Sequence, residues 1–219
     1  MICRLTFSTS GEDIAMADFS LKQLSGSGDI GFGDRGLVRA DITVDGLSTS
    51  MVQIDQANTT VDGTVTDHLI NLDLVAGDGD IQLSGRGGLS ADYEWNGDID
   101  RAMLTHVRFG AWRLRDAARL TAGRKGGALD GFCMQSTAGG GCLTASIDEN
   151  SAWRVALSEF VFNTEMLSQW GLSPVDTTAE VSGNGLVYGT GGVVSQLEAM
   201  LSAVQVRMSI EGIDGFDSF

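Results

Sequence analysis

The 219-residue chain contains one proline and no apolar run of about 18 residues. Without such a run, the sequence carries no signal for a membrane-spanning helix. The first twenty residues also lack the charged segment and the continuous apolar segment of a secretory signal peptide. We therefore expect neither an anchor nor a signal peptide in this chain.

Basic residues are scarce. The chain contains 14 Lys and Arg residues and 29 Asp and Glu residues, which gives it a net charge of −15. Nucleic-acid binding requires clustered Lys and Arg that neutralise phosphates. The composition therefore argues against nucleic acid, or an anionic membrane surface, as the main partner. The few basic residues lie mainly in 101–125.

Signatures of catalysis and of metal binding are also lacking. The two histidines, His68 and His106, lie in separate strand-like segments and form no H-E-x-x-H motif, and no G-x-S-x-G motif occurs. The string GSGDIG at 26–31 matches G-x-G-x-x-G, but no helix follows it, so we interpret it as a glycine-rich turn. The string GDGD at 77–80 lacks the repetition of a stacked calcium loop. We expect no enzyme activity, no cofactor and no metal site, and we interpret both histidines as strand-surface residues.

What the chain does have is glycine, at 30 residues, together with 42% hydrophobic residues. This combination favours many short strands separated by turns, and it supplies enough apolar side chains for a sizeable core. Glycines in GRKGG at 123–127 and STAGGG at 136–141 are suited to tight turns. We predict an all-β chain whose region 93–153 is an antiparallel meander.

Apolar and polar residues alternate strictly in three segments, VRADITVDGL at 38–47, HLINLDLVA at 68–76 and DIQLSG at 80–85. A period of two is typical of a strand with one apolar face and one wet face. Such a sheet covers its apolar face by closing into a barrel, by stacking as a sandwich or by curling into a trough. A plain buried core and an open groove both fit this pattern.

Two segments look less extended. Asn163 is suited to cap a helix at 164–170, where Gly171 and Pro174 follow as helix-ending residues. We therefore predict one short helix there. The segment 192–204 fits both helical and strand spacing in its first part, and that part stays open.

Cys133 and Cys142 flank the 136–141 turn across a predicted hairpin, which makes a disulfide between them plausible and leaves Cys3 free. Two free thiols in a reducing compartment are the alternative.

Several motifs follow one another along about two thirds of the chain. They are VDGTVTDHLINLDL (61–74), DIQLSGRGGL (80–89), WNGDI (95–99), the strand AWRL followed by DAARL (111–120), FCM (132–134), GCL (141–143), WRVAL (153–157) and VSGNGL (181–186). In this order they resemble the TamB family of Gram-negative envelope proteins, the translocation and assembly module subunit.

The resemblance implies an inner-membrane-anchored periplasmic protein with a long β-taco groove. Such a protein partners the outer-membrane barrel TamA and supports outer-membrane protein assembly and lipid transport. Full members have an N-terminal anchor helix and a C-terminal conserved domain, and neither is found here. We therefore expect residues 1–219 to be a single continuous β-rich segment of an elongated curled antiparallel sheet, an internal piece of a longer protein.

If the chain forms such a groove, the alternating aliphatic face lines the groove and holds phospholipid acyl chains. The candidate groove residues are Val38, Ile42, Val44, Ile70, Leu72, Leu74, Ile81 and Leu83. Docking to a TamA-like barrel is expected only through the full-length protein.

The alternative is a secreted repetitive β protein, such as an adhesin or autotransporter passenger, acting as a surface-binding module. A solenoid of that class predicts a strict repeat of fixed length. Only a weak repeat is present, in GSGDIGF (26–32), GDGDIQL (77–83) and WNGDIDR (95–101). The irregular spacing favours the trough.

Overall fold

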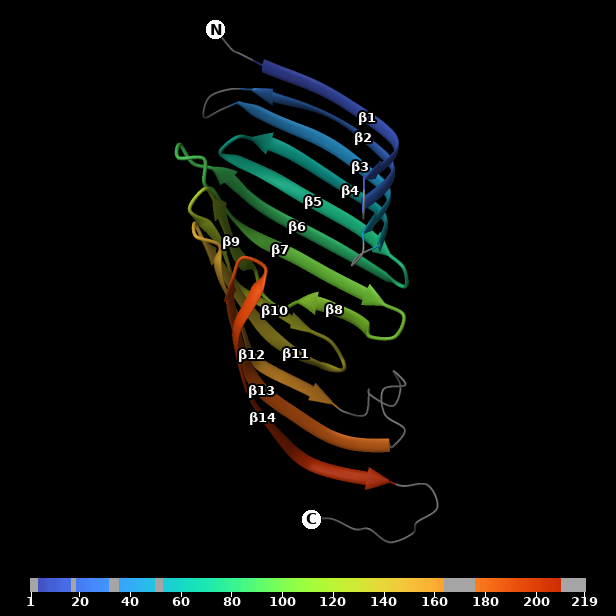
Figure 1. Ribbon diagram of the computed structural model, residues 1–219, viewed down its shortest axis with the longest axis vertical. Coiled ribbons are helices and arrows are strands. Elements are labelled where there is room, and N and C mark those ends of the chain that lie inside the picture. The colour runs from blue at the N-terminus through green and yellow to red at the C-terminus, as the bar shows by residue number, and fades with distance from the viewer. Residues whose placement is uncertain (1–3, 17–18, 32–35, 50–52, 164–175, 210–219) are drawn as a thin grey trace.

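The computed structural model describes residues 4–16, 19–31, 36–49, 53–163 and 176–209. Within these ranges every regular element is a β-strand, and all 14 strands join one antiparallel sheet (Figure 1). The strands are β1 (Arg4–Met16), β2 (Phe19–Gly31), β3 (Leu37–Thr49), β4 (Gln53–Thr64), β5 (Asp67–Ala76), β6 (Gly79–Leu89), β7 (Trp95–His106), β8 (Gly110–Leu114), β9 (Ala118–Gly123), β10 (Gly126–Gln135), β11 (Gly139–Asp148), β12 (Ala152–Asn163), β13 (Asp176–Thr190) and β14 (Val193–Ser209). The all-β prediction is confirmed, and the described part contains no helix long and apolar enough to cross a membrane.

The topology is a meander in which consecutive strands pair, with one irregularity. β8 and β9 both pair with β7 on one side and with β10 on the other. They are two halves of one strand position, interrupted at residues 115–117. The expectation of many short strands is wrong, because every strand except β8 and β9 has ten residues or more.

Glycines inside the strands explain this error. The GSGDIG string, interpreted as a turn, lies within β2. Gly28 pairs with Phe7 of β1, and a Cβ atom on Gly28 would come within 2.6 Å of the Phe7 ring. The glycine makes room for the ring on the neighbouring strand, and this cross-strand requirement is not visible in a local pattern.

The remaining local predictions divide into three groups. The turn predicted in GRKGG occurs at 124–125. Of the open segment 192–204, residues 193–204 belong to β14, which pairs with β13 from Thr190↔Val193 onward. The predicted helix at 164–170 falls outside the described residues.

The pairing register sorts side chains onto two faces, since directly paired residues project to the same side of a sheet. One row runs Ile42–Thr59–Leu72–Leu83–Ala102, and the next runs Val44–Ala57–Leu74–Ile81–Leu104. We call the side that carries these rows the apolar face and the opposite side the polar face.

A line of irregularities crosses the sheet and bends its strands. Register shifts fall between Ser84 and Gly85, Leu129 and Phe132, Gly140 and Cys142, and Leu157 and Phe160. Positive backbone φ angles occur at Gly131 (71°) and Glu159 (51°) in these strands. They also occur at Asp13 (50°) and Gly46 (62°) in β1 and β3. Such bulges bend strands and increase their twist, and Figure 1 shows the strands curving rather than lying flat.

The sheet shields few side chains from solvent. Its accessible surface is 14905 Å², against about 9,700 Å² for a compact monomer of the same mass. Apart from glycines, seven described residues are buried: Leu21, His68, Ala102, Ala118, Cys133, Ala138 and Cys142. In the described ranges no second sheet and no helix covers either face.

Candidate functional site: the apolar face of the sheet

All eight candidate groove residues lie on the apolar face. Ile42, Leu72 and Leu83 belong to one row, and Val44, Leu74 and Ile81 to the next. Val38 and Ile70 lie on the same face nearer the ends of their strands. Each of the eight is half-buried, so none is packed as in a closed core.

The apolar face continues beyond β6 in spite of the register shifts. Leu104 pairs with Trp112, Leu114 with Met134, and Leu129 with Leu120. Further members of the face, by pairing register, are Phe132, Leu143, Val155, Leu157 and Val187. Alternation in the sequence is weak in this part, because each bulge changes the parity of the residues that follow it.

His68 is not the strand-surface residue that we expected. It is only 6% exposed, and its Nε2 accepts a hydrogen bond of 2.9 Å from Nε1 of Trp95. With that tautomer, Nδ1 donates to the carbonyl oxygen of Thr64 at 2.9 Å. Both ring nitrogens are therefore used, which makes His68 a structural partner of Trp95 rather than a general base.

The Trp95 ring lies against two glycines. A Cβ atom on Gly87 or Gly97 would come within 2.5 Å of the Trp95 indole carbons. These glycines pair with each other and continue the row of His68. Local sequence patterns do not indicate this cluster, since it joins residues from β5, β6 and β7.

Two further tryptophans resemble Trp95 in their placement near strand ends. Nε1 of Trp112 donates to the carbonyl oxygen of Phe109, and Nε1 of Trp153 donates to that of Gly191, each at 2.9 Å. Each indole thus satisfies its N–H at the edge of the sheet while its ring adds apolar surface.

The polar face carries arginine–aspartate pairs that sequence analysis missed. Arg39 contacts Asp62 at 2.9 Å, and Arg119 contacts Asp98 at 3.5 Å. By register, one continuous row across β2–β10 contains Asp29, Arg39, Asp62, Leu69, Arg86, Asp98, Arg119 and Asp130. The Arg–Asp neighbours in this row lie 10 to 23 residues apart in sequence, so only the pairing register brings them together.

Ion pairs in and beside this row lower the pKa of two carboxyl groups, those of Asp29 and Asp67. Hydrogen bonds from Arg4 and then Thr6 lower the pKa of Asp29. Hydrogen bonds from Arg86, at 2.7 and 2.6 Å, lower the pKa of Asp67. Arg4, Arg86 and Asp67 are solvent-exposed and Asp29 is half-buried, so these pairs favour one register rather than supply much stability.

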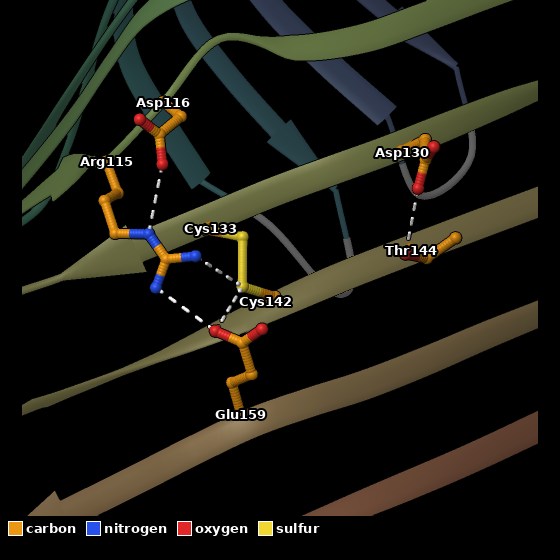
Figure 2. The surroundings of a disulfide bond; sticks show 7 residues. All are labelled: Arg115, Asp116, Asp130, Cys133, Cys142, Thr144 and Glu159. Atoms are coloured by element: carbon orange, nitrogen blue, oxygen red, sulfur yellow. Dashed lines mark hydrogen bonds and ion pairs between the residues drawn. A yellow bond between two sulfur atoms is a disulfide. The ribbon is translucent and has the colours of Figure 1, made fainter.

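The predicted disulfide is present. Cys133 of β10 and Cys142 of β11 are paired directly opposite each other on the polar face, with a sulfur–sulfur distance of 2.11 Å. Figure 2 shows Arg115 beside this bond, with Nη2 at 3.7 Å from the Cys142 sulfur. Cys3 lies outside the described residues.

Arg115 also joins two carboxylates around the disulfide. It contacts Glu159 and Asp116, each at 3.2 Å, and these groups raise the pKa of the guanidinium (Figure 2). Glu159 Oε2 lies 3.6 Å from the Cys142 sulfur, which has no proton in the disulfide and so donates no hydrogen bond. Arg115 thus links the interruption between β8 and β9 to β12, across β10 and β11.

Within the described ranges, no group of three His, Cys, Asp or Glu side chains is arranged to hold a metal ion. The chemistry offered by the apolar face is burial of hydrocarbon, with the charged side chains on the other face.

A family model described as "TamB, N-terminal domain" matches residues 3–213 of the chain. Searches of curated proteins and of solved structures gave no match.

Proposed function

The chain belongs to the TamB family of envelope proteins, and we propose that it forms part of a periplasmic trough that carries apolar cargo between the two membranes. The cargo that fits this surface best is the acyl chain of a phospholipid. In this proposal the trough also supports outer-membrane protein assembly, and it acts by binding rather than by catalysis.

The observation that carries the proposal is the extended apolar face. Half-buried aliphatic side chains lie on β3, β5 and β6, with Ala57 and Thr59 between them on β4, and the register continues the face as far as β13. A single layer of 13 strand positions spaced about 4.8 Å apart spans roughly 58 Å. An exposed apolar surface of this size is typical of a binding surface.

The energetics favour an acyl chain as the occupant. Transfer of hydrocarbon from water to an apolar surface contributes about 0.8 kcal/mol per buried methylene group. The bends across the sheet support a trough, since they allow the apolar face to curve around a chain. Ala102 and Ala118, which pack at these bends on the apolar face, are 3% and 0% exposed.

A closed sandwich would also hide this face, but it requires a second layer. In the described residues the 14 strands form one sheet only. The adhesin alternative gains no support, because a solenoid stacks parallel coils whereas these strands pair as consecutive antiparallel hairpins.

Anchoring in the inner membrane and docking to a TamA-like outer-membrane barrel belong, in this proposal, to the full-length protein. The 219 residues contribute the length of the trough. This proposal is consistent with the match of the chain to the N-terminal domain of the family.

The test is a charge placed on either face of the same strand. Leu72→Asp puts a carboxylate among acyl chains, whereas Asn71→Asp puts it on the polar face one residue away. In cells that depend on the full-length protein, we expect Leu72→Asp to block phospholipid transfer at normal protein abundance and Asn71→Asp to leave it intact. Equal transfer by both folded variants would contradict the proposal.

A further inference from the structure

One titratable side chain is buried on the apolar face. Among the residues that the structure describes, His68 is the one buried residue with a polar side chain. By pairing register it belongs to the row Val38–Gly63–His68–Gly87–Gly97–Leu120–Leu129. No other member of this row can carry a charge, so the row offers no partner to a charged imidazole.

The hydrogen bonds of His68 require a neutral ring. Nε2 accepts from the Trp95 indole, and Nδ1 lies at the carbonyl oxygen of Thr64, each at 2.9 Å. Because an indole N–H only donates and a carbonyl oxygen only accepts, the ring proton must be on Nδ1. An imidazolium has a proton on both nitrogens and accepts no hydrogen bond. Protonation of His68 is therefore incompatible with its bond to Trp95.

Trp95 differs in this respect from two other tryptophans. Trp112 and Trp153 donate to backbone carbonyl oxygens, which do not titrate. Histidine is the side-chain type whose charge commonly changes between about pH 5 and pH 8. Of these three indoles, only that of Trp95 is held by an acceptor that acid can remove.

The bond to His68 is also the only polar contact that the Trp95 ring can make, because an indole has a single N–H. The ring is half-buried and tilted by 48° against the imidazole, with a centroid distance of 6.4 Å. It lies against Gly87 and Gly97, which have no side chain that could accept the N–H instead. An unpaired N–H is costly away from water, so loss of the acceptor favours movement of the indole toward solvent.

Charged side chains around His68 do not compensate for an added proton. On the strands from β4 to β9, those in the flanking rows are Asp62, Asp67, Arg86, Asp98 and Arg119, all on the polar face. Each of them is already in an ion pair on that face. Glu94, which precedes Trp95, lies beside Gly123, since a Cβ atom on this glycine would come within 2.8 Å of the Glu94 Cγ. Gly123 belongs to the polar face by alternation from Leu120. The apolar face thus offers no carboxylate to an imidazolium at this position.

We propose that His68 and Trp95 form an acid-sensitive latch at this end of the apolar face. At neutral pH the imidazole holds the indole over Gly87 and Gly97. In acid, Nε2 takes a proton from solvent, the hydrogen bond breaks, and the indole leaves the two glycines. The same step places a positive charge in a row of glycines and aliphatic side chains, which disfavours hydrocarbon there.

The opening is local, because the strand pairing does not use either ring. The β5–β6 and β6–β7 ladders remain, and Val65 of the β4–β5 turn keeps its backbone hydrogen bonds to Gly36 and Leu89, at 2.8 and 2.9 Å. The inference goes beyond the proposed function. It describes a change in the surface of the apolar face, whichever cargo that face carries.

The experiment is an NMR titration of the oxidised, 15N-labelled 219-residue chain from about pH 8 to about pH 5. Trp95→Phe assigns the indole N–H resonance of Trp95, and those of Trp112 and Trp153 serve as internal references. His68→Gln replaces the imidazole by an amide, whose oxygen can accept the indole N–H but does not titrate. His106→Gln is the matched control, because His106 lies at the opposite end of β7 from Trp95.

We expect the Trp95 resonance to shift with the uptake of one proton while both reference resonances stay in place. Nuclear Overhauser contacts between the Trp95 ring and the α-protons of Gly87 and Gly97 should disappear in the same step. His68→Gln should abolish the shift, and His106→Gln should leave it unchanged.

Three results would overturn the inference. The first is a Trp95 resonance that does not move in the folded chain down to about pH 5. The second is joint movement of the resonances of Trp95, Trp112 and Trp153, which would show general unfolding in place of a local latch. The third is a shift that survives in folded His68→Gln. The first two are read from the unaltered chain, so the test does not depend on the folding of any variant but the one that assigns the resonance.

Discussion

From β1 to β6 neighbouring strands pair without a register shift, whereas β6–β7, β10–β11, β11–β12, β12–β13 and β13–β14 each carry at least one. The first region keeps strict alternation of side chains. The second contains the interrupted strand position of β8 and β9, the disulfide and the Arg115 contacts.

The two regions therefore specify the pairing register of their strands in two different ways. In β3–β6, a slip by one residue would move Asp73 onto the apolar face and Leu72 onto the wet face, so the side-chain pattern itself opposes slippage. In β10–β12, the bulges weaken that protection because they already change the parity. The covalent link between Cys133 and Cys142 supplies the missing constraint.

The largest expected effect on the free energy of unfolding is that of a charge buried at the bends of the second region. Ala118 is fully buried, so Ala118→Asp leaves an unpaired carboxylate inside and should lower the free energy of unfolding by about 3 to 5 kcal/mol. The matched change Ala111→Asp, at an exposed position of β8, should stay within about 0.5 kcal/mol. Urea unfolding of both variants is the measurement, and equal stabilities would contradict the packing at the bends.

The next effect is that of the disulfide. Opening a loop with a sequence separation of 9 by Cys133→Ser with Cys142→Ser should cost about 2 to 3 kcal/mol of unfolding free energy. Native-state hydrogen exchange should show faster exchange in β10–β12 and little change in β3–β5. Uniform loss of protection across both regions would refute the division, and added reductant should not affect the double variant.

A smaller effect is expected at the ion pairs of the first region. Because Arg86 lowers the pKa of Asp67 in the folded chain, this carboxylate stabilises the fold above its unfolded pKa of about 4, and the contribution disappears as pH falls through the lowered folded value. Asp67→Asn should therefore be less stable than the unaltered chain at neutral pH, and the gap should close in acid and in high salt. A gap that is independent of pH would show that the pair does not favour the register.

Sequence analysis predicted the part of the fold that local patterns encode. Alternation in 38–47 and 68–76 placed Ile42, Leu72 and Leu74 on one face, and the turn between Cys133 and Cys142 placed the two cysteines opposite each other. Both results depend only on a period of two and on short hairpins.

The remainder depends on register between strands. The local pattern predicts a turn at Gly28 because the Phe7 ring that needs its space belongs to another strand. The same kind of pattern predicts a surface position for His68 because Trp95, its partner, lies 27 residues away. The Arg–Asp row likewise emerges only when distant segments are aligned.

The most direct test of the account is photo-crosslinking at neighbouring positions of the same strand, in cells that make the full-length protein. A photoreactive residue replaces Leu72 or Ile42 on the apolar face, and Asn71 or Thr43 on the polar face serves as the matched control. We predict phospholipid adducts at Leu72 and Ile42 and none at Asn71 and Thr43. Folded protein without lipid adducts at either apolar position, or with equal adducts on both faces, would contradict the acyl-chain trough.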